Sequence, residues 1–226
     1  MRTIAIGDIH GCRVSLEALV AYAGITKADT IVTLGDYVDR GPDTRGVIDF
    51  LLALRKKVKL VSLLGNHEVI MLEARASREA TINWLDERVG GDATLDSYQA
   101  TSFDDIPAAH WKFISKAEMY HEIDTHFFVH ASAVPDIPLD MQPPMMLLWE
   151  RFDQPPPHQN GKIMVCGHTS QRSGVPVNLG HAICIDTWAC GEGWLTALDV
   201  QSGVYWQTNE RGERRAGEIA ELLGHS

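Results

Sequence analysis

Long apolar runs and paired cysteines are both missing from the 226-residue sequence. A membrane-spanning helix needs about 20 consecutive apolar residues. No run approaches that length, so we expect no membrane partner. The four cysteines form no CxxC pair, which argues against a structural zinc knuckle, and they are too few for a disulfide framework. The apolar start turns polar at Asp8, so we predict no secretory signal and a cytoplasmic protein with reduced thiols.

Positive charge is also scarce. The chain has 20 Lys and Arg against 30 Asp and Glu, which gives a formal net charge of −10. A strongly acidic protein repels nucleic-acid backbones, and this excludes a general DNA or RNA binder. A phosphate-ester substrate would therefore need local positive charge, from arginine or from a metal ion, to overcome the global field.

Three apolar, strand-like segments occur early in the chain, and each ends in glycine followed by Asp or Asn. They are residues 3–8, 30–36 and 59–66, and apolar residues at helical spacing occupy 14–23 and 47–54 between them. This β-α-β-α-β order predicts a parallel sheet with right-handed crossovers. Sites in such sheets form beyond the carboxyl ends of the strands. The three pairs of glycine and Asp or Asn, which we call glycine corners, should therefore lie on one rim of the sheet.

The remainder of the sequence predicts helices and then more strands. A polar, mostly helical stretch runs from 68 to about 121 and includes an insertion at about 78–115. Seven of the ten prolines lie in 135–157, which predicts an irregular loop. Further strands are expected at 117–124, 126–131, 162–168, 181–187, 194–200 and 203–209, and a short amphipathic helix at 218–224. We predict a single α/β domain over residues 1–226, with two sheets packed face to face and helices outside.

Side chains capable of chemistry follow the strands at the glycine corners. The motifs supply Asp8 and His10 in GDIHG, Asp36, Asp39 and Arg40 in GDYVDRG, Asn66 and His67 in GNHE, and His130 and His168 at the ends of later apolar runs. Mixed oxygen and nitrogen ligands of this kind suit Mn, Fe or Zn. A central aspartate indicates two metals that share one carboxylate, about 3.5–4 Å apart, around a phosphoryl group. We expect Gly7, Gly35 and Gly65 to permit the sharp turns that aim the next side chain at the metals.

Four further residues are interpreted without a role as metal ligand or catalyst. Cys12 is interpreted as a small residue at a helix start, with a redox-sensitive thiol as the alternative. Glu68 opens a helix, where a carboxylate interacts favourably with the helix dipole. His181 is interpreted as structural or as the support of a ligand, and Trp84 as core packing.

In this order, the motifs GDIHG, GDYVDRG and GNHE resemble the signature of the phosphoprotein phosphatase family of calcineurin-like metallophosphoesterases. The segments FVHA, LLWER, CGHT and IDT extend the resemblance from Gly7 to about Val200, as in the short bacterial and phage serine/threonine protein phosphatases. The resemblance implies a metal-dependent phosphatase. It also implies a four-layer α/β/β/α sandwich in which two mixed sheets are flanked by helices.

The same resemblance implies a role for each motif residue. One divalent metal would be held by Asp8, His10 and Asp36, and a second by Asp36, Asn66, His130 and His168. His67 would be the general acid, paired with Asp39, while Arg40 and Arg151 would bind phosphate oxygens. The implied reaction is in-line attack on a phosphate monoester by a hydroxide that bridges the two ions. Mn²⁺ is the expected metal, with Fe or Zn as alternatives.

Two positions depart from the family pattern and bear on the substrate. Leu64 precedes GNHE, where many protein phosphatases of this family have arginine, and Trp188 follows IDT, where it would narrow the groove. Symmetrical bis(5'-nucleosyl)-tetraphosphatases often have an apolar residue before the motif, but they typically show GNHD and lack the aspartate that is Asp39 here. We therefore predict a serine/threonine-type phosphatase that acts on a phosphorylated protein, a peptide or a small phosphate ester. Hydrolysis of nucleotide polyphosphates is the alternative, and a metal-binding scaffold without activity is a third hypothesis.

Overall fold

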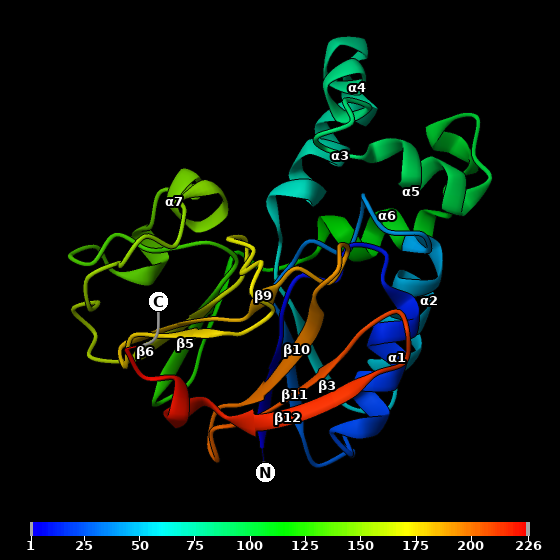
Figure 1. Cartoon of the computed structure of the whole chain (residues 1–226). Helices are drawn as coiled ribbons and strands as arrows, with labels where there is room; N and C mark the ends of the chain where they lie inside the picture. Colours follow the sequence, from blue (N-terminus) through cyan, green and yellow to red (C-terminus); the bar gives the residue numbers. More distant parts are fainter. Residues whose placement is uncertain (1, 225–226) are drawn as a thin grey trace.

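Two mixed β-sheets pack face to face at the centre of the computed structural model, which describes residues 2–224 (Figure 1). Within those residues the larger sheet has seven strands in the order β12-β11-β10-β1-β2-β3, and β9 pairs with β10 beside this path. The smaller sheet has five strands in the order β4-β5-β6-β8-β7. The prediction of two packed sheets is therefore confirmed.

The N-terminal third forms the predicted parallel β-α-β-α-β unit. The strands are β1 (Thr3–Ile6), β2 (Thr30–Thr33) and β3 (Lys59–Ser62), and the crossover helices are α1 (Arg13–Tyr22) and α2 (Thr44–Leu54). In register, Ile4 lies beside Ile31, and Val32 lies beside Val61. All three strands therefore end on one rim, each just before its glycine corner.

The C-terminal strands return to this first sheet. Strand β9 is Asp186–Thr187, β10 is Trp194–Asp199, β11 is Val204–Thr208 and β12 is Arg214–Glu218. β10 runs antiparallel beside β1, with Ala5 opposite Leu198. The expected strands at 194–200 and 203–209 are confirmed as β10 and β11, and the sequence did not assign them to either sheet.

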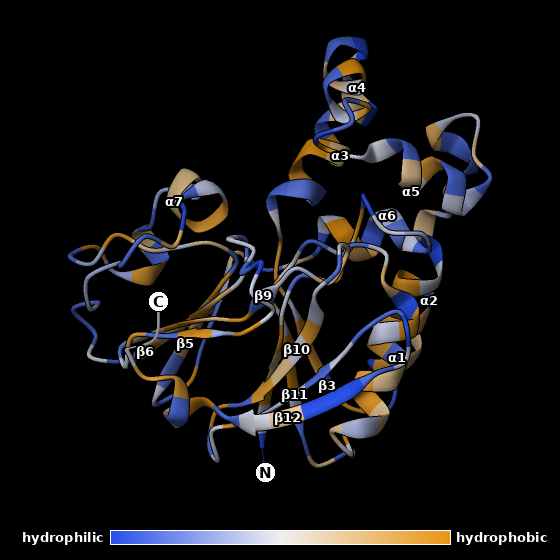
Figure 2. Ribbon diagram, viewed as in Figure 1, coloured by the Kyte–Doolittle hydropathy of each residue, from blue (hydrophilic) through white to orange (hydrophobic). Residues whose placement is uncertain are grey.

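The tail differs from the predicted helix over 218–224. The strand β12 extends to Glu218, and only a short 3₁₀ turn, η3 (Ile219–Leu222), lies within the predicted range. Figure 2 shows β12 as a hydrophilic ribbon at the edge of the larger sheet. An edge strand with charged residues such as Arg214 and Arg215 has little apolar alternation, and so the sequence pattern did not indicate it.

The smaller sheet consists of five short strands. They are β4 (Tyr120–Glu122), β5 (His126–Val129), β6 (Ile163–Cys166), β7 (Val177–Asn178) and β8 (Ala182–Cys184). β5, β6 and β8 are parallel, so the residues after β5 and β6 lie on the same rim. The two-residue β7 was not predicted, because a strand of this length carries no readable alternation.

Short helices occupy residues 66–115, which connect β3 of the larger sheet to β4 of the smaller sheet. They are α3 (Asn66–Ala76), α4 (Arg78–Trp84), α5 (Gly91–Tyr98), η1 (Phe103–Asp105) and α6 (Ala108–Ser115), and α3, α4 and α5 rise above the sheets in Figure 1. The proline-rich segment contains η2 (Leu139–Met141) and α7 (Pro144–Trp149). No helix within residues 2–224 combines the length and the apolar character needed to cross a bilayer. The count of one domain stays a prediction.

Successive residues of the central strands belong to different apolar layers. In β1, Ile4 and Ile6 pack with residues of α1 and α2, whereas Ala5 packs between the two sheets. In β5, Phe128 packs between the sheets and Phe127 packs on the opposite face, with residues of α7. Neighbouring strand residues point to opposite faces, so the sheets are covered on both outer sides. This gives the predicted four layers.

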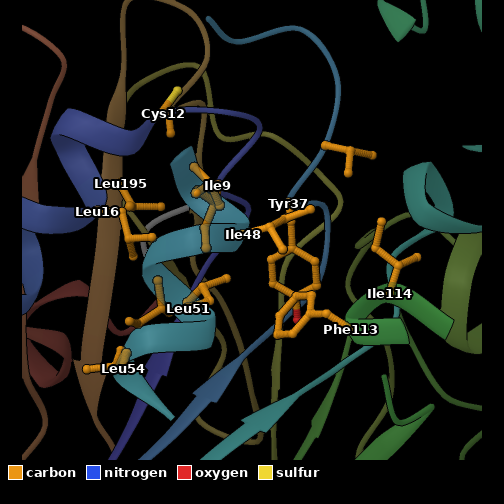
Figure 3. Packing of buried hydrophobic residues seen from close by; sticks show 14 of the residues in the cluster. Ile9, Cys12, Leu16, Tyr37, Ile48, Leu51, Leu54, Phe113, Ile114 and Leu195 are labelled. Atoms are coloured by element: carbon orange, nitrogen blue, oxygen red, sulfur yellow. The ribbon is translucent and has the colours of Figure 1, made fainter. Parts of the chain in front are cut away.

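The cluster beneath α1 and α2 also supports the loop that follows β2. Figure 3 shows Leu16 and Ile48 in this cluster, together with Tyr37 and Phe113. The rings of Tyr37 and Phe113 lie edge to face with centroids 5.3 Å apart. The Tyr37 hydroxyl donates to the carbonyl oxygen of Leu63 at 2.7 Å. The backbone beside Asp36 is therefore anchored by a fully buried side chain.

Candidate active site

The strand ends of both sheets meet at one rim and bring together the residues of the glycine corners. Those after β1, β2, β3 and β5 are buried, and His168 after β6 is half-buried. The set comprises Asp8, His10, Asp36, Asn66, His67, His130 and His168. The parallel unit presents the first five and the smaller sheet presents the last two, so the site lies where the two sheets join.

Asp36 is the central carboxylate of this group. Its Oδ2 lies 3.4 Å from Nε2 of His10, and its Oδ1 lies 3.5 Å from Nε2 of His130. Two sets of possible ligand atoms lie within 4.8 Å of one another, His10–Asp36–His67 and Asp36–His130–His168, and both contain Asp36. A carboxylate whose two oxygens face different nitrogen ligands has the geometry needed to join two neighbouring cations.

Backbone hydrogen bonds orient the histidine rings. Nδ1 of His10 donates to the Val38 carbonyl oxygen at 2.8 Å, and Nδ1 of His130 donates to the Leu34 carbonyl oxygen at 2.9 Å. This leaves Nε2 of each ring with the lone pair that faces the site, a common arrangement for metal-binding histidines. Burial, together with the neighbouring His130, lowers the pKa of His168 to about 4, so this ring is neutral near pH 7.

Asn66 is the point at which the second group converges. Its Oδ1 lies 2.9 Å from Nε2 of His130 and 3.0 Å from Nδ1 of His168. His130 and His168, both expected around the second metal, thus lie within hydrogen-bonding distance of Asn66. Asn66 is the first residue of α3, directly after Gly65, and this position projects its amide into the rim.

The glycine corners place these side chains in two different ways. Gly35 has a φ of +102°, and the next residue, Asp36, has a φ of +49°. Gly7 and Gly65 do not have positive φ, so a left-handed backbone is not the reason that these two positions need glycine. A Cβ atom at Gly65 would instead collide with the Asp36 side chain, and one at Gly7 with the carbonyl group of Ile185. These two glycines are required because another chain segment approaches closely.

Unusual backbone conformations gather in the same motifs. Five of the predicted site residues have positive φ, namely His10, Asp36, Asp39, Arg40 and His168. Each such conformation costs a non-glycine residue about 1–3 kcal/mol and persists only where its surroundings hold it in place. Such a concentration at one rim is typical of a functional site.

His67 and Asp39 form a buried hydrogen-bonded pair. Nδ1 of His67 lies 2.8 Å from Oδ2 of Asp39, and both side chains are almost wholly buried. The ring of His67 packs edge to face on that of His10, with centroids 4.7 Å apart. Burial lowers the pKa of His67, and the charges of Asp36 and Asp39 oppose that shift. The pair predicted for proton transfer is brought together beside the candidate metal ligands.

Glu68 does more than interact with the dipole of α3, which was our interpretation from the sequence. Its fully buried carboxylate accepts backbone N–H bonds from Asp36 and Gly65 at Oε2 and from Tyr37 and Val38 at Oε1, at 2.7 to 3.2 Å. Burial and the charge of Asp36 raise the pKa of Glu68 to about 8, and the backbone donors oppose the rise. Four donors occupy both oxygens, so this side chain fixes the loop that carries Asp36.

We expect Glu68→Gln to destabilise the protein by about 2–3 kcal/mol, because an amide nitrogen would then face two buried N–H groups. The free energy of unfolding can be measured by urea denaturation. Glu73→Gln on the exposed face of α3 is the matched control and should change that energy by less than about 0.5 kcal/mol. Equal stability of the two variants would contradict the role of Glu68 as a clamp on the loop.

The two predicted phosphate-binding arginines occupy different surroundings. Nη1 of Arg40 lies 2.9 Å from Nε2 of His10, which places this guanidinium at the edge of the ligand group. Arg151 is solvent-exposed, in a segment that contacts the loop after β6. In that segment the Trp149 carbonyl oxygen lies 3.1 Å from Nε2 of His168. The structure therefore places the backbone near Arg151 beside His168, while Arg151 itself is exposed to solvent.

Several residues outside the ligand set also have defined surroundings. Half-buried Leu64 packs with the apolar cluster beneath β5 and β6. Trp188 has a φ of +65°, and the guanidinium of Arg172 lies 5.2 Å from its ring centroid.

His181 lies 2.7 Å from the carbonyl oxygen of Pro155, as suits a structural residue. Cys12 precedes α1 and is fully buried, and burial raises the pKa of its thiol, which argues against the redox alternative.

The interpretation of Trp84 as packing alone is incomplete. Its indole Nε1 donates to Oδ1 of Asp39 at 2.9 Å, the oxygen that does not face His67. Thr94, which we did not single out from the sequence, donates to the same oxygen at 2.9 Å. These contacts join residues 45 and 55 positions apart, and no local pattern in the sequence indicates them.

The sequence profile described as calcineurin-like phosphoesterase matches residues 1–197. The chain belongs to this family. The predicted likeness to its phosphoprotein phosphatases is supported by the similarity of one segment to a bacterial serine/threonine-protein phosphatase. By family, the protein is a phosphoesterase.

Curated relatives match the phosphoesterase over part of their length. It is 42% identical over 77 residues to a symmetrical bis(5'-nucleosyl)-tetraphosphatase from Pectobacterium atrosepticum, covering 34% of this chain and 27% of that protein. It is 40% identical over 88 residues to serine/threonine-protein phosphatase 1 of Salmonella typhimurium, covering 38% of each chain. A solved protein serine/threonine phosphatase from Saccharomyces cerevisiae shares the fold, with a TM-score of 0.61, 17% identity, and coverage of 88% of this chain and 73% of that chain.

The ligand set of the phosphoesterase fits divalent cations. Oδ1 of Asp8 is buried and has no hydrogen-bond partner among residues 2–224, while Oδ2 accepts from the backbone N–H of His168 at 3.0 Å. Burial, together with the charges of Asp186 and Asp36, raises the pKa of Asp8. A buried carboxylate oxygen without a partner is costly, and a cation beside it would remove that cost.

Proposed function

We propose that this phosphoesterase is a two-metal phosphomonoesterase of the serine/threonine protein phosphatase type, with His67 as its general acid. The observation that carries the proposal is the buried His67–Asp39 pair, 2.8 Å apart, beside a carboxylate that faces two groups of metal-binding side chains. A general acid must lie within reach of the leaving group and have a defined tautomer. The pair meets the second requirement directly.

The metal ligands proposed are those of the strand ends. Asp8, His10 and Asp36 would hold one divalent ion, and Asp36, Asn66, His130 and His168 would hold another. When bound, such ions supply positive charge that stabilises a phosphoryl group in its transition state and favours a water nucleophile at neutral pH. Mn²⁺ is the metal we propose, since mixed oxygen and nitrogen ligands suit it.

The protein's own groups would handle the leaving oxygen and the phosphate charge. Asp39 accepts from Nδ1 of His67, so Nε2 is the nitrogen that can give a proton to the departing alkoxide. The buried carboxylate also stabilises the imidazolium before transfer. Arg40, at the edge of the ligand group, would bind phosphate oxygens through its fork of N–H donors. Arg151, which is exposed to solvent, would do the same.

Hydrolysis of a dinucleoside polyphosphate is the second candidate. It is favoured by the apolar Leu64 before GNHE and by the similarity of 77 residues to a symmetrical bis(5'-nucleosyl)-tetraphosphatase. Against it stands Asp39, which tetraphosphatases of this kind typically lack and which here lies 2.8 Å from Nδ1 of His67. We therefore favour phosphate monoesters.

A substrate panel separates these functions. We expect Mn²⁺-loaded protein to hydrolyse phosphoserine or phosphothreonine peptides with a kcat/KM at least about tenfold above that for diadenosine tetraphosphate, a preference of about 1.4 kcal/mol. Phosphate release would be measured for both, with p-nitrophenyl phosphate as reference. A preference for the dinucleotide would favour the second candidate. No turnover of any ester despite bound metal would favour an inactive scaffold.

A further inference from the structure

Asp39 is held from the side opposite His67 by two residues of the helical stretch. Its Oδ1 accepts from Nε1 of Trp84 and from Oγ1 of Thr94, both at 2.9 Å, while its Oδ2 faces His67. The carboxylate is fully buried. Three hydrogen bonds in different directions leave a buried carboxylate a single orientation.

The backbone of Asp39 and Arg40 is held by the same stretch. The N–H of Asp39 donates to Oγ1 of Thr94 at 2.8 Å, and the N–H of Arg40 donates to the carbonyl oxygen of Gly90 at 3.1 Å. Both Asp39 and Arg40 have left-handed φ values, +69° and +67°. Two successive non-glycine residues rarely adopt this conformation, so external hydrogen bonds are needed to keep them in it.

The hydroxyl of Thr94 is fully used in this arrangement. It accepts from the N–H of Asp39 and donates its one hydrogen to Oδ1 of the same residue, so it closes a ring on Asp39. Oγ1 of Thr44 in α2 lies 3.2 Å away and can supply a further hydrogen. Thr94 is fully buried in α5, and a serine would preserve these contacts whereas a valine would abolish them.

The indole of Trp84 is likewise fixed in place. It is fully buried at the end of α4 and packs against Phe103, with ring centroids 5.5 Å apart. Gly91 lies directly against the indole, because a Cβ atom at this position would collide with it. Gly90, on the other side of the same turn, faces the backbone of Arg40. The two glycines thus let the α4–α5 turn approach both Trp84 and Arg40.

We infer that Trp84 and Thr94 are positioning residues for proton transfer: from the helical stretch, they orient Asp39 so that its second oxygen holds the ring of His67. This inference rests on the proposed function, because it assigns Trp84 and Thr94 to support the general acid named there. Within residues 2–224, neither side chain forms a hydrogen bond to a candidate metal ligand; both act through Asp39. Their effect should therefore appear in the step that needs the proton.

Thr94→Val and Thr94→Ser form a matched pair that tests this inference. In metal-loaded protein, Thr94→Val should lower kcat for phenyl phosphate, a poor leaving group, by roughly tenfold or more. The loss for p-nitrophenyl phosphate, which needs less protonation, should be below about threefold, and KM should change by less than about twofold. Thr94→Ser should retain near-normal values, and Trp84→Phe should repeat the pattern of Thr94→Val.

A spectroscopic measurement gives a second readout. In Zn²⁺-loaded protein, the Nδ1 proton of His67 should give a slowly exchanging, downfield proton NMR signal in the natural protein and in Thr94→Ser. It should broaden or disappear in Thr94→Val. Melting temperatures would show that the compared variants are folded, and if Thr94→Val is not, Trp84→Phe takes its place in both measurements.

The outcomes separate this inference from the proposed function. A Thr94→Val protein that matches Thr94→Ser on both esters and keeps the signal would overturn the inference, and so would equal losses on both esters with the signal retained. A natural protein that hydrolyses neither ester would overturn the proposed function. The NMR signal would then still test whether Thr94 orients the Asp39–His67 pair.

Discussion

His67→Asn is expected to retain bound metal and to lose at least about a hundredfold of kcat on a phosphoserine peptide, because general acid catalysis contributes about 10²–10⁴-fold. The loss should be far smaller on p-nitrophenyl phosphate, whose leaving group is stable as an anion. The reason lies in the pair that His67 forms with Asp39, in which Nδ1 is engaged at 2.8 Å. Steady-state kinetics with both substrates and metal analysis of the same samples would measure these quantities.

His181→Asn is the matched control for this experiment. His181 is a half-buried histidine near the later motifs, whereas His67 is buried, and the side chain of His181 contacts the carbonyl oxygen of Pro155. The His181→Asn variant should keep the natural ratio of activity on the phosphoserine peptide to activity on p-nitrophenyl phosphate. A His67→Asn protein that loses equally on both substrates would argue against the acid role. Loss of metal from it would make His67 a ligand, which its place beside His10 and Asp36 allows.

Asp36→Asn is expected to abolish activity and to weaken metal binding in both candidate groups. Asp36 is the residue that the two groups share, with its two oxygens facing His10 and His130. Replacing one oxygen by an amide nitrogen removes a negative charge and a ligand atom at once. Metal content after dialysis, and calorimetric titration with Mn²⁺, would measure the loss.

His10→Ala gives the comparison that makes this result specific. His10 belongs to one of the two groups of possible ligand atoms, so we expect this variant to weaken binding of one ion and to keep the other. The natural protein would show the full stoichiometry. Retention of full metal content by Asp36→Asn would refute its shared role, and identical losses in the two variants would show that the two groups bind as one unit.

The candidate ligands could be predicted from the sequence because each lies next to a strand end that has a local signal. Asp8 and Asp36 directly follow apolar runs and a glycine, and parallel strands bring such positions to one rim. The contacts of Trp84 and Thr94 with Asp39 could not be predicted in this way. They depend on how a polar helical stretch folds back over the site, and its sequence carries no spacing that records this.

The glycine corners show how a correct pattern can have more than one cause. Gly35 has a positive φ, which suits the predicted turn, but Gly65 is required because Asp36 approaches its α-carbon. Single letters cannot distinguish these two reasons, since both exclude a side chain. The edge strand β12 was missed for another reason: charged residues at a sheet edge leave no apolar alternation to read.

The place of β10 has a consequence for how the protein acquires its site. β1, which precedes Asp8, is paired on one side by β2 and on the other by β10, and the N–H of Gly7 donates to the carbonyl oxygen of Thr196 at 3.0 Å. A growing chain emerges from the ribosome N-terminus first. The strand β1 can therefore pair with β10 only after residues 194–199 have been synthesised. Such distant pairing slows folding. The GDIHG motif would therefore be synthesised long before the strand that precedes it has both of its neighbours in the sheet.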